Sequence, residues 1–256
     1  MKKQKILISV VFIIIFFVAL YYIAKLNEAN YSISIVSYTE NTSYIEHPVI
    51  EGLIDKKKQD SINTLLKDQV LFGAKNNLNE TFVDFSYPNY SYQFRSGVGI
   101  SNRLISSFWY SFDGFGEVQL EDGGVVRNTY RHFGITIDME TGKKIHLSDF
   151  MEIDERLINS SDGSGIETDY NIEGNPVFHN FKDAFMIYTS EDKRDNFHLF
   201  SSQEIIEMLK DNESETKWYI DENRNIIFIF GESSVSIPYL QITDAIYPKY
   251  RDALKK

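Results

Sequence analysis

The chain has 256 residues, of which 43% are hydrophobic and 14% aromatic, and this suits one globular domain with a sizeable core. It contains no cysteine, which excludes a disulfide framework and a lipid-modified cysteine anchor. The formal net charge is −11, and without the four lysines up to Lys25 it becomes −15, from 22 basic and 37 acidic residues. Such an acidic surface argues against binding of nucleic acid and against docking on anionic lipid. It suits either a cationic partner or simple solubility.

An uncharged stretch of nineteen residues runs from Ile6 to Ala24. As a helix it would be about 28 Å long, close to the thickness of the bilayer hydrocarbon core. Lys2, Lys3 and Lys5 precede it, and this basic flank predicts a cytoplasmic N-terminus. We therefore expect a single-pass protein of the cell membrane with its domain outside. The alternative is a cleaved signal peptide and a secreted domain, but the small-x-small cleavage pattern is missing before Ala24.

The sequence predicts four parts and a single folded domain, since no repeat or long flexible linker interrupts it. The parts are a cytoplasmic tip (1–5), a transmembrane anchor (6–24), a stalk that becomes the first strand (25–44) and an extracytoplasmic domain (45–256).

The first helix of the domain is predicted to begin after Asp55, a suitable N-cap residue. Its apolar side chains recur on one face up to Val70, with charged residues on the other face. Aromatic residues separated by Ser, Asn and Gly then follow over 82–112, a pattern that predicts several strands and turns.

A hairpin is predicted over 133–147, where apolar and polar residues alternate. A three-residue loop over 140–142, with Gly142 in the left-handed conformation, would pair Asp138 with Lys144 and Ile137 with Ile145. A two-residue loop would instead put the two faces out of register.

Helix and strand signals continue to the C-terminus. Capping-box spacing predicts one helix that begins at Asp149, with Glu152, and another that begins at Ser201, with Glu204. A long surface loop is predicted over 159–175. Further strands are predicted over 185–188, 218–220, 226–230 and 235–239, and a short helix over 247–254. The expected fold class is α+β: an antiparallel sheet of hairpins with a few helices packed on it, preceded by a transmembrane helix.

No residue is assigned to a catalytic, cofactor-binding or metal site. The acidic clusters lack the EF-hand pattern, and the histidines are scattered: His47, His132, His146, His179 and His198. No nucleophile motif or phosphate loop is present, so we expect no cofactor and no enzymatic activity. The alternative is an enzyme that acts on cell-wall glycan through carboxylates assembled by the fold, for instance Asp113 and Glu117.

Aromatic residues offer a second kind of site. Trp109, Tyr110, Tyr90 and Tyr92 are candidates for stacking on sugar rings. Half of the side chains of a strand face the core, however, so we expect these residues to belong to the core or to an ordinary surface.

The chain also resembles a known bacterial family in three phrases: HPVIEGLIDKKKQDSINTLLKD (47–68), GITIDMETGKKIHLSDFME (134–152) and KWYIDENRNIIFIFGESSVSIPYLQITD (217–244). These are similar to the extracytoplasmic domain shared by RsiV-type lysozyme-sensing anti-sigma factors and the N-terminal region of PdaC-type peptidoglycan deacetylases. The resemblance implies a relative in a Gram-positive-type envelope that binds lysozyme or wall material.

The chain departs from that family at both ends. Only five residues precede Ile6, so sigma-factor binding is not expected, and no deacetylase domain is expected after Lys256. The family's Gly-rich stretch before the central hairpin remains only as Gly123-Gly124, and no binding residue is carried over.

The sequence thus leaves three hypotheses. The favoured one is a membrane-anchored, non-catalytic module that binds a cationic protein such as lysozyme or a cell-wall component. The others are the glycan-acting enzyme and a structural spacer.

Overall fold

The computed structural model describes residues 31–40, 43–77, 90–116, 118–119, 125–126, 129–160, 181–182, 201–211, 217–230 and 233–255. The predicted anchor (6–24), the predicted strand 185–188 and most of the predicted loop 159–175 lie outside these ranges. Within them, no helix combines the length and the apolar character needed to cross a bilayer.

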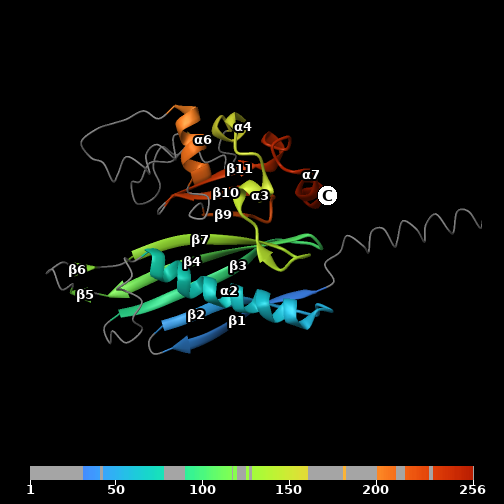
Figure 1. Cartoon of the computed structure of the whole chain (residues 1–256). Coiled ribbons are helices and arrows are strands. Elements are labelled where there is room, and N and C mark those ends of the chain that lie inside the picture. The colour runs from blue at the N-terminus through green and yellow to red at the C-terminus, as the bar shows by residue number, and fades with distance from the viewer. Residues whose placement is uncertain are drawn as a thin grey trace, which may run out of the picture.

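A six-stranded sheet, the large sheet, forms the first body of the fold (Figure 1). Its strand order is β1-β2-β3-β4-β7-β8. The strands are β1 (Ser32–Glu40), β2 (Ser43–Glu51), β3 (Tyr90–Ser101), β4 (Ile105–Gly116), β7 (Thr129–Asp138) and β8 (Lys143–Lys144). A separate two-stranded sheet joins β5 (Val118–Gln119) to β6 (Val125–Val126).

The α+β class is confirmed, but the prediction of one antiparallel sheet is wrong. β2 and β3 are parallel, with Tyr44 opposite Gln93 and Ile45 opposite Phe94. Parallel neighbours need a crossover connection, and the helix α2 (Lys56–Asn77) lies between these strands in the chain. The helix is longer than the sequence periodicity predicted, and its length carries the chain back along the sheet.

α2 begins and packs as its sequence predicts. Asp55 caps it, since its Oδ1 accepts a hydrogen bond from the Lys58 N–H at 3.0 Å. Ile62, Leu66 and Val70, spaced by four residues, are at most 1% exposed against the large sheet. The helix is also bonded to β2, because Asn63 both accepts from and donates to the backbone of Ile50.

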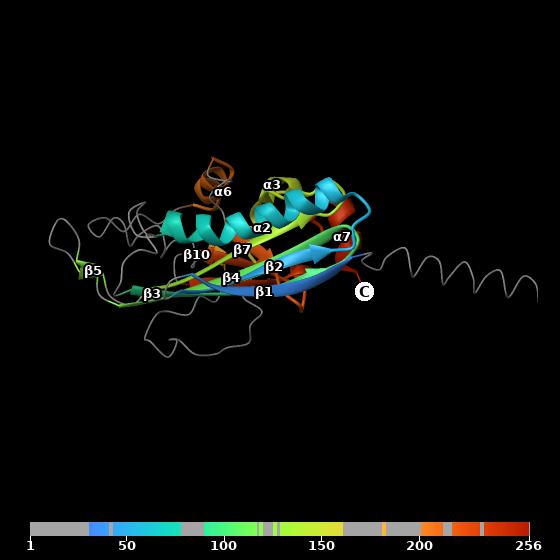
Figure 2. The ribbon, with the colours of Figure 1, turned by 90° about the horizontal axis from the view of Figure 1, so that it is seen from below.

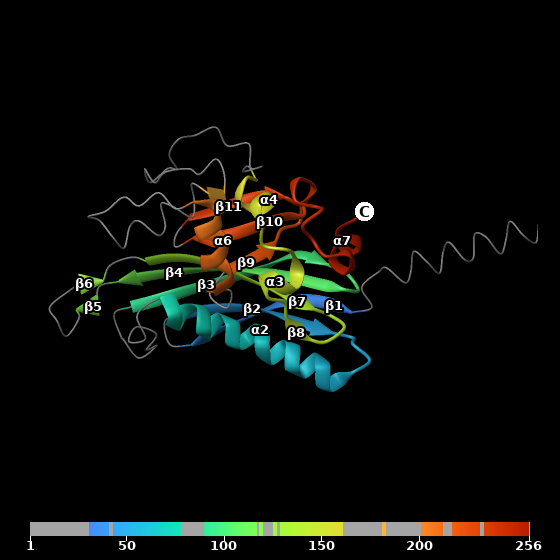
Figure 3. The ribbon, with the colours of Figure 1, turned by 45° about the horizontal axis from the view of Figure 1, so that its top comes forward.

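A three-stranded antiparallel sheet, the small sheet, organises the second body. It consists of β9 (Lys217–Ile220), β10 (Asn225–Phe230) and β11 (Ser233–Pro238), in the order β11-β10-β9. Figure 3 shows it beyond β7, together with α3 (Leu147–Phe150), α4 (Glu155–Ile158), α6 (Ser202–Asp211) and α7 (Pro248–Leu254). A short 3-10 helix, η1 (Tyr239–Gln241), follows β11. These elements share a core separate from the one beneath α2.

Several sequence predictions in this body are confirmed. Ser201 and Glu204 form the expected capping box: the Ser201 N–H donates to the Glu204 carboxylate at 2.7 Å, and the Glu204 N–H donates to Ser201 Oγ at 3.3 Å. The β9–β10 hairpin, β11 and the C-terminal helix also lie where they were predicted.

The predicted hairpin register is wrong by one residue. Asp138 pairs with Lys143 and Ile137 with Lys144, so the loop has four residues. The Asp138 carboxylate explains this, because its Oδ1 accepts hydrogen bonds from the N–H groups of Glu140 (2.9 Å) and Thr141 (3.0 Å) and winds the loop into a helical turn. Gly142 closes that turn at φ 74°, in the predicted left-handed conformation.

Asp138 therefore has other partners than the predicted Lys144. Its Oδ2 accepts hydrogen bonds from Lys249 Nζ at 2.6 Å and from the Tyr250 hydroxyl at 3.1 Å, both on α7. Burial alone would raise the pKa of Asp138, but the hydrogen bonds from Lys249 and the loop backbone outweigh it and lower the pKa. The Asp138 carboxylate thus links the large sheet to α7 of the second body.

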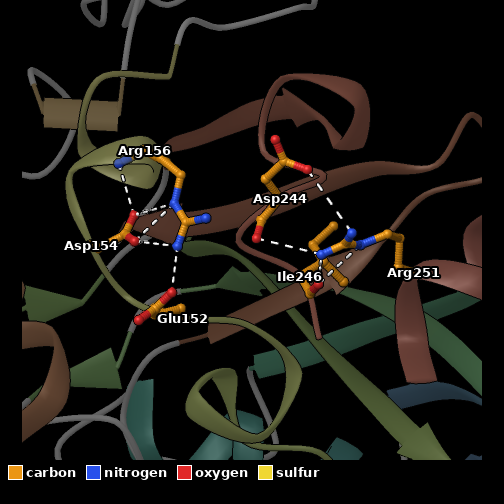
Figure 4. Close-up of polar contacts among 6 residues, drawn as sticks. All are labelled: Glu152, Asp154, Arg156, Asp244, Ile246 and Arg251. Carbon is orange, nitrogen blue, oxygen red and sulfur yellow. Dashed lines mark hydrogen bonds and ion pairs between the residues drawn. The ribbon is translucent and has the colours of Figure 1, made fainter. Parts of the chain in front are cut away.

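The prediction of a helix that begins at Asp149 is also wrong. Asp149 lies inside α3, and a second short helix, α4, begins after Asp154, whose carboxylate accepts from the Arg156 N–H at 2.9 Å. Figure 4 shows the Arg156 guanidinium between Glu152 and Asp154. The break in the helix occurs because Met151 makes a β-bridge to Ile246. Figure 4 also shows Arg251 of α7 donating to the Ile246 carbonyl, which holds that segment in place.

Candidate ligand-binding face

α2 covers only one face of the large sheet, which Figure 2 shows nearly edge-on with α2 above it. Side chains alternate along a strand, so the neighbours of the buried residues point to the other face. We call this second surface the open face. Its described side chains include Tyr44 and Glu46 on β2, Gln93 and Arg95 on β3, Trp109, Ser111 and Asp113 on β4, and His132 on β7.

The small sheet covers one end of the open face. Ser107 and Thr136 are bonded to each other there at 2.9 Å, and Ser107 Oγ accepts from the Ile220 N–H of β9 at 2.7 Å. Gly99 permits the close approach, because a Cβ at this position would overlap the Ile220 carbonyl. The rest of the open face is not covered by any helix or strand that the structure describes.

Trp109 lies where the covered part of the open face ends. Its indole rests on Gly97 of the neighbouring strand, where a Cβ would overlap the ring. Gly134, its neighbour on β7, leaves room in the same way for the ring of Tyr219 on β9. Two glycines thus allow two aromatic rings to lie close to the sheet. Trp109 also packs against the buried side chains of Tyr219, Ile227 and Ile229.

His132 lies between these two rings. Its ring centroid is 6.2 Å from that of Trp109, edge-on, and 5.4 Å from that of Tyr219. Burial lowers the pKa of His132 to about 4, so the imidazole is neutral at neutral pH. Its Nε2 is buried and has no hydrogen-bond partner among the residues that the structure describes. We call Trp109, His132 and Tyr219 the aromatic cluster.

Two carboxylates share the open face with the aromatic cluster. Glu46 is held in place by the Tyr44 hydroxyl, which donates to it at 2.8 Å, and by the Ser96 N–H at 3.2 Å. Asp113 lies four residues along β4 from Trp109, on the same face and partly exposed. Its proposed catalytic partner, Glu117, lies outside the described residues, so the distance between them is not defined.

The aromatic candidates from the sequence therefore divide between the two faces. Tyr92 and Tyr110 are core residues, 1% and 0% exposed, as expected. Trp109 instead is only partly buried and lies on the open face. The aromatic cluster was not predicted, although the strand glycines Gly97 and Gly134 indicate that another group approaches the backbone closely.

Elsewhere, no group of three potential ligands is suited to a metal ion among the described residues. His47 and His146 lie apart from His132, and His179 and His198 are outside the described ranges. A groove of about 370 Å³ is lined by Asn102, Arg103, Leu104, Glu140, Asp252, Ala253 and Lys255. Cations and carboxylates are balanced in it, so its charge favours no single kind of ionic ligand.

Comparison with known proteins identifies no matching family model and no matching curated protein. Two solved structures of DUF3298 family proteins are similar to the chain. One, from Bacteroides fragilis, has 11% identity and a TM-score of 0.46 over 90% of this chain and 99% of its own. The other, from Pseudomonas aeruginosa, has 10% identity and a TM-score of 0.42 over 87% and 97%. Similarity at this level assigns neither a family nor a function to the chain.

Proposed function

We propose that the chain is a membrane-anchored, extracytoplasmic, non-catalytic module that binds a cationic protein at the open face. The observation that carries this proposal is the placement of Trp109 on the same face as the carboxylates Glu46 and Asp113. A Lys or Arg side chain over an indole is attracted by the ring quadrupole, and nearby carboxylates add charge complementarity.

The charge of the chain supports the same partner class. The part after Lys25 carries a formal −15, so a basic protein would be drawn to it over a distance set by the ionic strength. The similarity of three sequence phrases to lysozyme-sensing proteins makes a basic lysozyme the first partner to test. The uncharged stretch 6–24 supports the membrane location.

Cell-wall glycan is the second candidate ligand, and Trp109 is again the observation that favours it. An indole fixed flat on a strand glycine is suited to stack on the apolar face of a sugar ring. Glycan binding would depend on Trp109 and little on salt, whereas binding of a basic protein would weaken steeply with salt.

The test is a calorimetric titration of the full-length chain, in detergent micelles, with a basic lysozyme and with soluble peptidoglycan fragments. We expect lysozyme binding, and we expect the double variant Glu46→Gln/Asp113→Asn to weaken it at least about tenfold. The matched control is Asp60→Asn/Asp68→Asn, the same loss of charge at exposed positions of α2 on the other side of the sheet. Equal weakening by both pairs would show that only net charge matters, and absence of heat with both ligands would refute the proposal.

A further inference from the structure

The most exposed large hydrophobic side chain that the structure describes is Ile54, which is 91% exposed. It lies in the loop between β2 and α2, within the segment 51–58 that we call the tip. The loop is held firmly: Gly52 adopts φ 93°, Leu53 is 5% exposed, and the Leu53 N–H donates to Gln59 Oε1 at 3.1 Å. Ile54 is thus fixed in water between a buried residue and a helix cap, where its exposure costs hydrophobic free energy.

The tip is locally basic although the domain is acidic. Lys56 and Lys57 are exposed in the first turn of α2, and Lys58 reaches the carbonyl of Met139 at 3.0 Å. The acidic residues of the tip are Glu51 and Asp55, and the Asp55 carboxylate is used as the cap of α2. Segments that bind the interface of a lipid bilayer combine apolar side chains with lysines, and the tip has both.

The tip lies beside the start of β1. Ser32 is opposite Glu51 in the β1–β2 ladder, so the strand start is adjacent to Gly52. Tyr31 is fixed at this end, since its hydroxyl donates to the Asn102 carbonyl at 2.7 Å and is within 2.6 Å of Ser106 Oγ. Figures 1 and 2 both place the start of β1, the start of α2 and the helix α7 at the same end of the molecule.

The length of the connecting segment limits how far this end can be from a membrane. Six residues, 25–30, separate Ala24 from Tyr31. Fully extended, they cover at most about 25 Å. If residues 6–24 cross the bilayer, the tip is therefore held near the lipid surface by covalent geometry.

We propose that the tip docks on the outer surface of the lipid bilayer, with Ile54 inserted at the interface and Lys56 and Lys57 on anionic head groups. This inference rests on the proposed membrane anchor. The overall negative charge opposes a broad contact with anionic lipid, so the contact is confined to the tip. Docking would hold the β-strands of the large sheet at a fixed orientation to the membrane.

The chain offers a clean test because it has no cysteine. Ile54→Cys in the full-length protein is labelled with an environment-sensitive fluorophore, and the protein is reconstituted into vesicles of phosphatidylcholine with and without phosphatidylglycerol. The matched control is Glu40→Cys, an exposed site at the other end of β1, about 27 Å away along the strand. Flotation of the vesicles reports separately whether the chain is membrane-bound.

We expect a quencher attached to lipid chains to reduce emission from position 54 at least about twofold more than from position 40. We also expect Lys56→Gln/Lys57→Gln to diminish this difference in the anionic vesicles and to leave it unchanged in the neutral ones. Equal quenching at both positions in protein that floats would overturn the docking proposal and leave the anchor intact. Protein that does not float would overturn both.

Discussion

Asp138→Asn tests the carboxylate that joins the hairpin turn to α7. Asn retains one carbonyl oxygen for the two loop N–H groups, but it removes the charged acceptor of Lys249 and Tyr250. A hydrogen bond to a charged group contributes about 1.5–3 kcal/mol, and a buried donor left unpaired costs about 1–3 kcal/mol. Since the Lys249 side chain is 40% exposed and also contacts Glu140 at 2.9 Å, part of this cost is recovered in water. We expect a net loss of about 2–3 kcal/mol.

The assay is urea unfolding of the full-length chain in detergent, followed by the fluorescence of the two tryptophans. The matched control is Asp244→Asn, because Asp244 is 89% exposed and lies 3.9 Å from its cation, Arg251. Its expected cost is below about 0.5 kcal/mol. Equal effects of the two substitutions would refute the assignment of Asp138 as a link between the two bodies.

The pH dependence of the Asp138→Asn effect follows from the direction of the pKa shift. The folded pKa of Asp138 lies below its ordinary value of 3.8, so its contribution is complete above the unfolded pKa and is lost as the pH falls through the folded pKa. The difference between wild type and variant should therefore be constant at neutral pH and shrink below about pH 4.

Three further predictions use the same unfolding assay. Gly99→Ala should cost about 3 kcal/mol, because its Cβ would overlap the Ile220 carbonyl and separate β9 from β3; a neutral effect would contradict this contact. Gly142→Ala should cost about 1–2 kcal/mol, because φ is 74° and the added Cβ would lie 2.8 Å from Lys58 Cγ; a neutral effect would contradict the left-handed assignment. His132 has a folded pKa of about 4, below its unfolded value, so its contribution is present above about pH 6.5 and is lost as the pH falls toward 4. His132→Phe should reduce the loss of stability between pH 6.5 and pH 4 by about 1–3 kcal/mol, and an unchanged pH profile would contradict the lowered pKa of His132.

The sequence predicts local structure at several positions where one side chain bonds to nearby backbone groups. Asp55 and the Ser201–Glu204 pair start helices because their side chains bond to backbone groups three residues away. The turn conformation of Gly142 was predicted for the same kind of reason. Such signals lie within a few residues and need no knowledge of the fold.

The errors arise where a distant residue competes. The hairpin register depended on Asp138, whose carboxylate caps its own turn and reaches α7, 111 residues away, instead of facing Lys144. Asp149 does not cap a helix as predicted, because Met151 pairs with Ile246 and ends α3 soon after Asp149. The parallel pairing of β2 with β3 likewise depends on a crossover that periodicity cannot detect.

The candidate site was only partly predictable for the same reason. Trp109 and Asp113 were noted in the sequence, but alternation alone does not say which face of a strand is covered. His132 and Tyr219 meet because β9 crosses the large sheet, a contact between residues 87 positions apart. Glycines at positions 97 and 134 were the available sign of that contact.

The central claim, a cationic partner bound at the open face, is tested most directly by fluorine NMR of the full-length chain labelled with 5-fluorotryptophan. The chain has two tryptophans: Trp109 on the open face and Trp218, 2% exposed, in the core of the second body. Trp218→Phe assigns the two signals. Addition of unlabelled basic lysozyme should shift or broaden the Trp109 resonance in a saturable, salt-sensitive manner and leave the Trp218 resonance in place. Binding that leaves Trp109 unchanged, or that moves both signals equally, would contradict the proposed site.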